Sequence, residues 1–221
     1  MNSRPQWWKQ PRLVSVVVDN PSWIIPFAKE LVLSLNEHGD NAVFVDNCRN
    51  VQKGGVAFFL GCINIATNEV LKQNYRNLIV HASDLPKGRG FSPLTWQILE
   101  GDSRIPICLL EAAELVDSGP VIFREWLEFA GHELINELRA AVGESSITLC
   151  RRYLDSDSPL MGKPQIGEAS THRRRRPADS RLDIDQTLRQ QFNLLRVVDN
   201  HHYPAWFEYL GCRYKITVEK F

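Results

Sequence analysis

Residues 13–19 read LVSVVVD, an almost uninterrupted apolar run rich in β-branched side chains, and Asn20–Pro21 follows directly. Such a run predicts a strand that is buried on both faces and ends in a turn. Residues 23–38 then repeat apolar side chains at helical spacing as far as Gly39, which suits the end of a helix. A buried strand followed by an amphipathic helix is the first half of a βαβ unit.

The same alternation continues along the chain. Further strands are predicted at 42–45, 56–60, 78–81, 105–110 and 121–123, and helices at 68–73, 93–100 and 126–142. We therefore expect an α/β fold with a mostly parallel, Rossmann-like sheet flanked by helices in residues 1–150. Residues 151–182 are rich in proline, glycine, serine and arginine, which indicates a linker or loop. Residues 183–221 form a small C-terminal region, predicted as a helix at 183–198 and a pair of strands at 203–209 and 213–218.

Composition excludes several classes of protein. The chain has 221 residues, and 26 lysines and arginines balance 26 aspartates and glutamates. Zero net charge leaves no reason to expect a partner in nucleic acid or a membrane surface. No apolar run approaches the roughly 20 residues that span a bilayer, and residues 1–12 lack the apolar core of a secretory signal. Five widely spaced cysteines without a CxxC motif indicate reduced thiols in a cytoplasmic protein, and no metal site.

Two segments contain the residues most suited to chemistry. Residues 81–93 read HASDLPKGRGFSP, so that His81 ends a predicted strand, where ligands of parallel sheets usually bind. A lone histidine is more often structural than functional. Residues 115–121 read LVDSGPV, and an acid such as Asp117 between two short strands is, taken alone, most often a turn residue or cap.

Taken together, the two segments resemble the formyltransferase family that uses N10-formyltetrahydrofolate. That family has His-x-Ser-x-Leu-Pro, a basic residue, Arg-Gly and a proline before a helix, followed about thirty residues later by Leu-Asp-Thr-Gly or a close variant. The corresponding residues here are His81, Ser83, Leu85, Pro86, Lys87, Arg89, Gly90 and Pro93, then Val116, Asp117, Ser118 and Gly119. The resemblance covers residues 13–145, and the C-terminal third resembles the tail of bacterial members that formylate nucleotide-linked amino sugars.

The resemblance implies roles for individual residues. His81 would take or shuttle the proton of the attacking amine, while Asp117 would orient the imidazole and favour its charged form. Leu85, Arg89, Gly90 and Asp117 would contact N10-formyltetrahydrofolate, the expected co-substrate.

One position departs from the family pattern. Ile79 stands where the family usually has an asparagine that polarises the formyl oxygen. Loss of such a donor typically costs about 10²–10³ in rate. Asn64, in the loop after the third strand, is a candidate replacement and a candidate substrate contact, and protonated His81 is another possible donor.

The C-terminal third offers two candidate substrate contacts. Arg173 begins a run of four arginines, which either forms a solvated loop paired with nearby aspartates or binds a nucleotide diphosphate. The turn that contains Asn200, Tyr203 and Trp206 offers aromatic planes on which a nucleobase could stack, although core packing is an equal alternative.

We therefore expect an N-formyltransferase that acts on a nucleotide-activated amino sugar in bacterial surface-glycan (lipopolysaccharide) biosynthesis. Two alternatives stay open: an enzyme like methionyl-tRNA formyltransferase, which would need a broad basic face, and a catalytically impaired homologue that binds folate or sugar. The C-terminal helix and strands could form a homodimer or simply complete the core.

Overall fold

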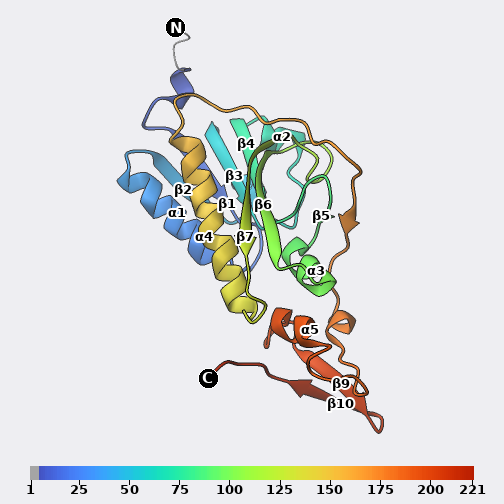
Figure 1. Ribbon diagram of the computed structural model, residues 1–221. Coiled ribbons are helices and arrows are strands. Elements are labelled where there is room, and N and C mark those ends of the chain that lie inside the picture. The colour runs from blue at the N-terminus through green and yellow to red at the C-terminus, as the bar shows by residue number, and fades with distance from the viewer. Residues whose placement is uncertain (1–4) are drawn as a thin grey trace.

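A computed structural model describes residues 5–221 of the chain. Its centre is a six-stranded sheet in the order β2–β1–β3–β4–β6–β7 (Figure 1). The bounds of these strands are β1 Leu13–Val17, β2 Asn41–Val45, β3 Gly54–Leu60, β4 Asn74–His81, β6 Arg104–Glu111 and β7 Val121–Glu128. The pairs among β1, β2, β3 and β4 are parallel, whereas β6 pairs antiparallel with both β4 and β7. The expected α/β fold with a mostly parallel sheet is confirmed.

Two long helices cover one face of the sheet. They are α1 Ile25–Glu37 and α4 Ile135–Leu154, which lie side by side against the strands in Figure 1. The largest apolar core lies between them and the sheet, and it includes Phe58 of β3 and Tyr153 of α4. Burial of this apolar surface is the main stabilising term of the fold.

The opposite face of the sheet is covered mostly by loops and short elements. On this face lie the short helix α2 Asn68–Leu71 and the 3₁₀ turn η2 Cys48–Asn50. The 3₁₀ turn η1 Gln6–Trp8 and the helix α3 Pro93–Glu100 instead add apolar side chains to the largest core. The remaining short elements are the 3₁₀ turn η3 Pro177–Ser180 and the two-residue strands β5 Arg89–Gly90 and β8 Thr171–His172. β5 pairs with β8, which returns the long segment after α4 to the loop that follows β4. Side chains at alternate strand positions, such as Val17, Phe59 and Ile79, form smaller clusters on this face.

The C-terminal residues form a small unit beyond one end of the sheet (Figure 1). It consists of α5 Phe192–Val197 and the hairpin of β9 Ala205–Tyr209 and β10 Cys212–Ile216. Its own core is a few residues around Leu195 and Ala205. Within the described residues, three ion pairs attach it to the main body: Arg139 of α4 to Asp199, Arg196 of α5 to Glu133, and Lys220 to Glu137 of α4.

Two predicted helices were wrong in extent. The helix predicted at 126–142 is instead the second half of β7 followed by α4, which begins only at Ile135 and ends at Leu154, beyond the expected boundary at 150. The helix predicted at 183–198 is confined to α5, because Ile184 and Leu188 are exposed and have no apolar partner to pack against. Within residues 5–221, no helix is long and apolar enough to cross a membrane.

Candidate active site

His81 and Asp117 meet at the end of β4. His81 is the last residue of this strand, and only 7% of its side chain and 8% of that of Asp117 are exposed. Its Nδ1 lies 3.4 Å from the Asp117 carboxylate, and its Nε2 lies 2.8 Å from the carbonyl oxygen of Gly88. The two motifs that the sequence pairs by resemblance are therefore in contact in the structure.

The path of the chain explains how Asp117 reaches His81. Since β6 is antiparallel to β4, Glu111 at its end lies opposite Leu78, and the loop that follows must turn back toward His81. Two tight features allow this return. Asp117 adopts a left-handed backbone conformation with φ +51°, and Gly119 packs so closely that a Cβ there would lie 1.7 Å from the Glu111 carbonyl oxygen. Only glycine fits at this crossing.

The hydrogen bonds at the site match a charged imidazole. Both ring nitrogens of His81 face an oxygen that can only accept a hydrogen bond, the Gly88 carbonyl and the Asp117 carboxylate. A neutral ring can donate to one of them, whereas the imidazolium can donate to both. The Asp117 carboxylate also accepts the backbone N–H of Gly90 at 2.9 Å, which orients it toward the ring. The geometry therefore favours a histidine that holds a proton for transfer or donates it to a developing negative charge.

A third side chain, which the sequence did not reveal, holds the Asp117 loop in place. The Gln165 amide donates to the carbonyl oxygens of Asp117 and Gly119 at 2.7 and 2.8 Å. Its own oxygen accepts from the guanidinium of Arg89 at 2.6 Å. Gln165 lies 48 residues after Asp117 in a segment expected to be a linker, so no local pattern could have indicated it.

The residues expected to contact folate surround Asp117 in different ways. The backbone N–H of Gly90 donates to the Asp117 carboxylate, and the Arg89 guanidinium donates to the Gln165 side chain. The Leu85 side chain is buried in an apolar cluster with Cys108 and Leu110. A groove of about 450 Å³ opens beside them, lined by residues 84–87, 121, 122, 124 and 163–168. It provides room for a ligand next to the loop that contains Gly88.

Asn64, the candidate replacement donor, and Ile79, which stands at the position of the usual asparagine, contact different parts of the chain. Asn64 lies in the loop after β3, where its backbone N–H donates to Asp19 at 2.9 Å, and the structure records no contact between it and His81. It lines a second cavity of about 780 Å³. Ile79 shares the face of β4 that carries His81, and it packs against Leu85 and Leu110. Neither contact therefore places a second hydrogen-bond donor beside His81 for a formyl oxygen.

The predicted substrate contacts of the C-terminal third are mostly engaged within the chain. The Arg173 guanidinium pairs with Asp179 and covers the ring of Trp96, which agrees with the interpretation of a paired, solvated loop. The Asn200 amide bonds the backbone of Val218 in both directions.

The two aromatic residues are partly exposed. The carbonyl oxygen of Tyr203 accepts from the Ser180 hydroxyl. The Trp206 indole donates to the Pro177 carbonyl, and its ring lies beside the guanidinium groups of Arg181 and Arg213. The structure does not bring these C-terminal residues into contact with His81.

Comparison with known proteins places this geometry in context. No protein-family model matches the chain. In sequence, the chain is 27% identical over 127 residues to methionyl-tRNA formyltransferase of Sulfurihydrogenibium sp. (strain YO3AOP1), a match that covers 56% of this chain and 41% of that protein. The match therefore spans less than half the length of this relative.

Solved structures resemble most of the chain. Methionyl-tRNA formyltransferase from Clostridium thermocellum gives a TM-score of 0.76 at 22% identity, over 91% of this chain and 89% of that one. Rv3404c from Mycobacterium tuberculosis, described as a likely sugar N-formyltransferase, gives 0.74 at 17% identity, over 94% and 97%. HypX from Aquifex aeolicus in complex with tetrahydrofolic acid gives 0.70 at 17% identity, over 92% and 37%.

The chain has the formyltransferase fold. The resemblance drawn from the two motifs is thus confirmed in fold and, over 127 residues, in sequence. Within that fold, His81 and Asp117 are neighbours through the crossing at Gly119, as described above.

Proposed function

We propose that this protein transfers a formyl group from N10-formyltetrahydrofolate to the amine of a nucleotide-linked amino sugar. The observation that supports this most strongly is the buried contact between His81 and Asp117, formed by two motifs that resemble those of formyltransferases. The relatedness to methionyl-tRNA formyltransferase and the tetrahydrofolate complex of HypX support the same reaction class.

Each residue at the site has a role in this reaction. The folate would lie against the loop of residues 84–90 and the Asp117 loop, and it would supply the formyl carbon. The His81 imidazolium donates its proton to the oxygen that becomes negative, and the neutral ring that results takes up the proton released by the amine. Asp117 stabilises the charged ring in either role, and Gly90 and Gln165 keep Asp117 in position.

The charged His81 ring can also take over the role of the asparagine that the family usually has at position 79. Ile79 has no donor, and Asn64 contacts Asp19 rather than His81. His81 Nε2 already donates to one carbonyl oxygen, that of Gly88, and we propose that a formyl oxygen replaces this acceptor during the reaction. A single charge-assisted donor can then serve where the family uses two groups. This argues for an active enzyme over a folate-binding homologue that has lost catalysis.

A sugar acceptor fits the charge of the chain better than tRNA does. A tRNA-binding protein needs a broad basic face, whereas this chain has zero net charge and the Arg173 guanidinium is paired with Asp179. The structural matches to Rv3404c and to the methionyl-tRNA formyltransferase of Clostridium thermocellum cover similar shares of the chain, so the preference for a sugar rests on charge. We also place the protein in the cytoplasm, in keeping with its widely spaced cysteines, and the glycan that receives the sugar would be a bacterial surface polysaccharide.

An acceptor panel tests the proposal. The purified protein would be mixed with N10-formyltetrahydrofolate and either nucleotide-linked amino sugars or methionyl-tRNA, and formylated product would be measured by mass spectrometry. We expect formylation of at least one amino sugar and none of the tRNA. Formylation of the tRNA alone would establish the alternative acceptor, and no product with any amine would indicate a binding protein.

A further inference from the structure

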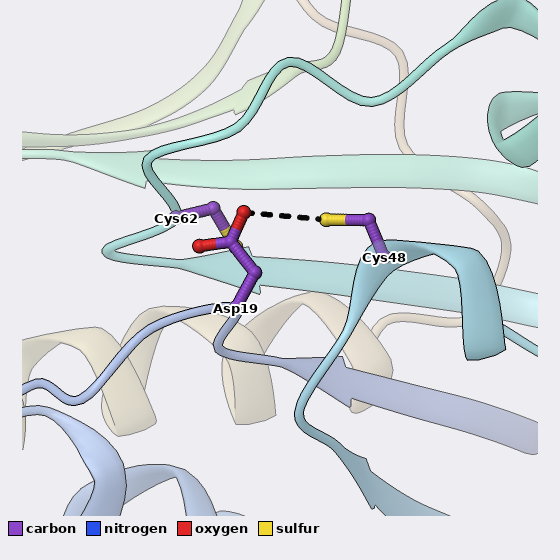
Figure 2. A group of neighbouring side chains, drawn as sticks. All are labelled: Asp19, Cys48 and Cys62. Carbon is purple, nitrogen blue, oxygen red and sulfur yellow. Dashed lines mark hydrogen bonds between the residues drawn. The ribbon is translucent and has the colours of Figure 1, made fainter.

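Asp19, Cys48 and Cys62 converge beyond the carboxyl ends of β1, β2 and β3 (Figure 2). Their ligand atoms, two sulfurs and one carboxylate oxygen, all lie within 4.8 Å of one another. The Cys48 thiol donates to Asp19 Oδ2 at 3.6 Å, and the Cys62 thiol donates to the carbonyl oxygen of Val17 at 3.4 Å. None of the proposed steps of formyl transfer uses this group.

The three residues come from three adjoining segments. Asp19 follows β1, Cys48 begins η2 after β2, and Cys62 follows β3, so each lies just beyond a neighbouring parallel strand. Spacings of 29 and 14 residues form no short metal-binding motif, and the sequence alone indicated no metal site. The topology of the sheet is what brings them together.

The carboxylate is held ready by the backbone. Asp19 Oδ1 accepts the N–H of Ile63 at 2.8 Å, and Oδ2 accepts that of Asn64 at 2.9 Å. Burial raises the pKa of Asp19, but these N–H groups and the Asn20 amide outweigh it and lower the pKa overall. The side chain is therefore ionised at neutral pH and oriented toward the sulfurs, as the outer shell of a metal site orients its ligands.

The two sulfurs lie within 4.8 Å of each other. The neighbouring Cys62 side chain lowers the pKa of Cys48, and the neighbouring Cys48 together with burial raises the pKa of Cys62. Cys48 is thus the thiol that ionises first, beside a second sulfur at short range. A thiolate is the form that binds metal ions.

The sulfur-to-oxygen distance between Cys48 and Asp19 is close to that expected around a tetrahedral ion. With bonds of about 2.3 Å to sulfur and about 2.0 Å to oxygen, a tetrahedral zinc site places sulfur and oxygen about 3.5 Å apart and two sulfurs about 3.8 Å apart. The observed sulfur-to-oxygen distance is 3.6 Å. The cavity of about 780 Å³ that Asp19 and Cys48 line leaves room for a water molecule as fourth ligand.

We propose that Asp19, Cys48 and Cys62 bind one thiophilic divalent cation, of which Zn²⁺ is the best match to two sulfurs and one oxygen. Binding replaces the two thiol protons, which pass to solvent, so that the ion is held by two thiolates and one carboxylate. Affinity therefore rises with pH. The ion would join the ends of β1 and β3 to η2, and through the backbone of Asn64 it would fix the loop that lines the larger cavity.

Cobalt(II) provides a direct test, independent of formyl transfer. The whole protein, fully reduced and stripped of metal with a chelator, would be titrated with Co²⁺ under anaerobic conditions. We expect one equivalent to give the thiolate charge-transfer band and the visible bands of a tetrahedral ion, and Zn²⁺ to displace it. Cys48→Ser and Cys62→Ser should each weaken binding by about 100-fold or more. Cys212→Ser, which removes an exposed thiol on β10, should bind like the wild type.

A second measurement needs no variant, in case the serine substitutions impair folding. Alkylation of the wild-type protein, mapped by mass spectrometry, should show that Zn²⁺ protects Cys48 and Cys62 but not Cys212. Absence of the charge-transfer band from the reduced wild type would overturn the proposal. Equal alkylation of all three thiols with and without Zn²⁺ would do so as well, as would a Cys48–Cys62 disulfide whose reduction restores no metal uptake.

Discussion

The site at the end of β4 and the C-terminal unit differ in how their side chains are held. His81 and Asp117 are almost fully buried, and each has partners from a distant segment of the chain. In the C-terminal unit, Trp206 and Tyr203 are partly exposed, and the small core involves only a few residues. The Arg213–Glu208 pair on the hairpin spans 4.0 Å and is open to solvent.

This difference in packing suggests that the His81 site performs the chemistry and that the C-terminal unit selects the substrate. Proton transfer needs groups fixed to a fraction of an ångström, which only a buried and fully bonded site provides. Selection of a substrate tolerates a more adaptable surface, and loosely packed regions are where such surfaces are usually found. The following substitutions come in matched pairs or with controls, and they test whether the two regions respond as differently as their contacts indicate.

The largest effect should come from the ion pair between Arg12 and Asp40, which is buried within the main body just before β1 and β2. Arg12 and Asp40 are both almost inaccessible, and the guanidinium makes two bonds to the carboxylate. Asp40→Ala leaves the buried Arg12 cation without its carboxylate and with only the Leu154 carbonyl as acceptor among the described residues, so we expect a loss of about 3–5 kcal/mol in the free energy of unfolding. Glu208→Ala on the hairpin should cost less than about 1 kcal/mol. Urea denaturation of both variants measures the difference, and similar losses would contradict it.

Two glycines provide the next comparison. Gly119→Ala would drive a methyl group into the Glu111 carbonyl and displace the Asp117 loop. We expect formyl transfer to fall by about 100-fold or more, since a shift of about 1 Å suffices for that loss. Gly211→Ala, in the hairpin turn at φ +79° with open space around it, should cost only about 1–2 kcal/mol of stability and leave kcat unchanged. An active Gly119→Ala variant would show that the loop does not need this crossing.

Gln165→Ala tests the clamp on the Asp117 loop. Two hydrogen bonds to backbone carbonyls disappear, and we expect kcat to fall by about 10- to 100-fold while the protein remains folded. Gln190→Ala removes an exposed glutamine near the C-terminal unit and should leave kcat unchanged. Steady-state kinetics give kcat for both variants. A normal kcat in Gln165→Ala would show that Gln165 has no role in positioning Asp117 for the reaction.

The smallest effect concerns substrate binding by the C-terminal unit. Trp206→Ala should raise the KM for the nucleotide sugar by about 10-fold, the value of one stacked base, and leave the KM for formyl-folate unchanged. Trp126→Ala is the matched control, because Trp126 is also partly exposed and also lies beneath a guanidinium, that of Arg104 on β6. Equal changes in both KM values with a lower Tm would place Trp206 in the packing of the unit, without a role in binding.

Local sequence predicted the fold where side chains and partners agree. The strands predicted at 13–19 and 56–60, which the structure has at 13–17 and 54–60, and the helix at 93–100 have continuous or periodic apolar patterns that the sheet or its covering helices then bury. The pattern at 183–191 is equally periodic, but no surface lies opposite it. There, side-chain bonds from Asp183 and Gln191 stabilise turns in place of a helix.

The site could be predicted only as far as its motifs extend. His81 and Asp117 were paired because two motifs occur in the expected order, and the structure brings them into contact. Gln165, and the group of Asp19, Cys48 and Cys62, depend on contacts across 14 to 48 residues that sheet topology creates. No periodicity or spacing in the sequence encodes such contacts.

The most direct test of the account is a single-turnover measurement on His81→Ala. With enzyme in excess over N10-formyltetrahydrofolate and an amino-sugar acceptor identified on the wild type, the rate of formyl transfer should fall by about 10²–10⁴-fold. The Tm should remain near that of the wild type, and His201→Ala, which removes an exposed histidine of the C-terminal unit, should transfer at the wild-type rate. A folded His81→Ala variant that keeps more than a tenth of the wild-type rate would contradict the assignment of His81 to proton transfer.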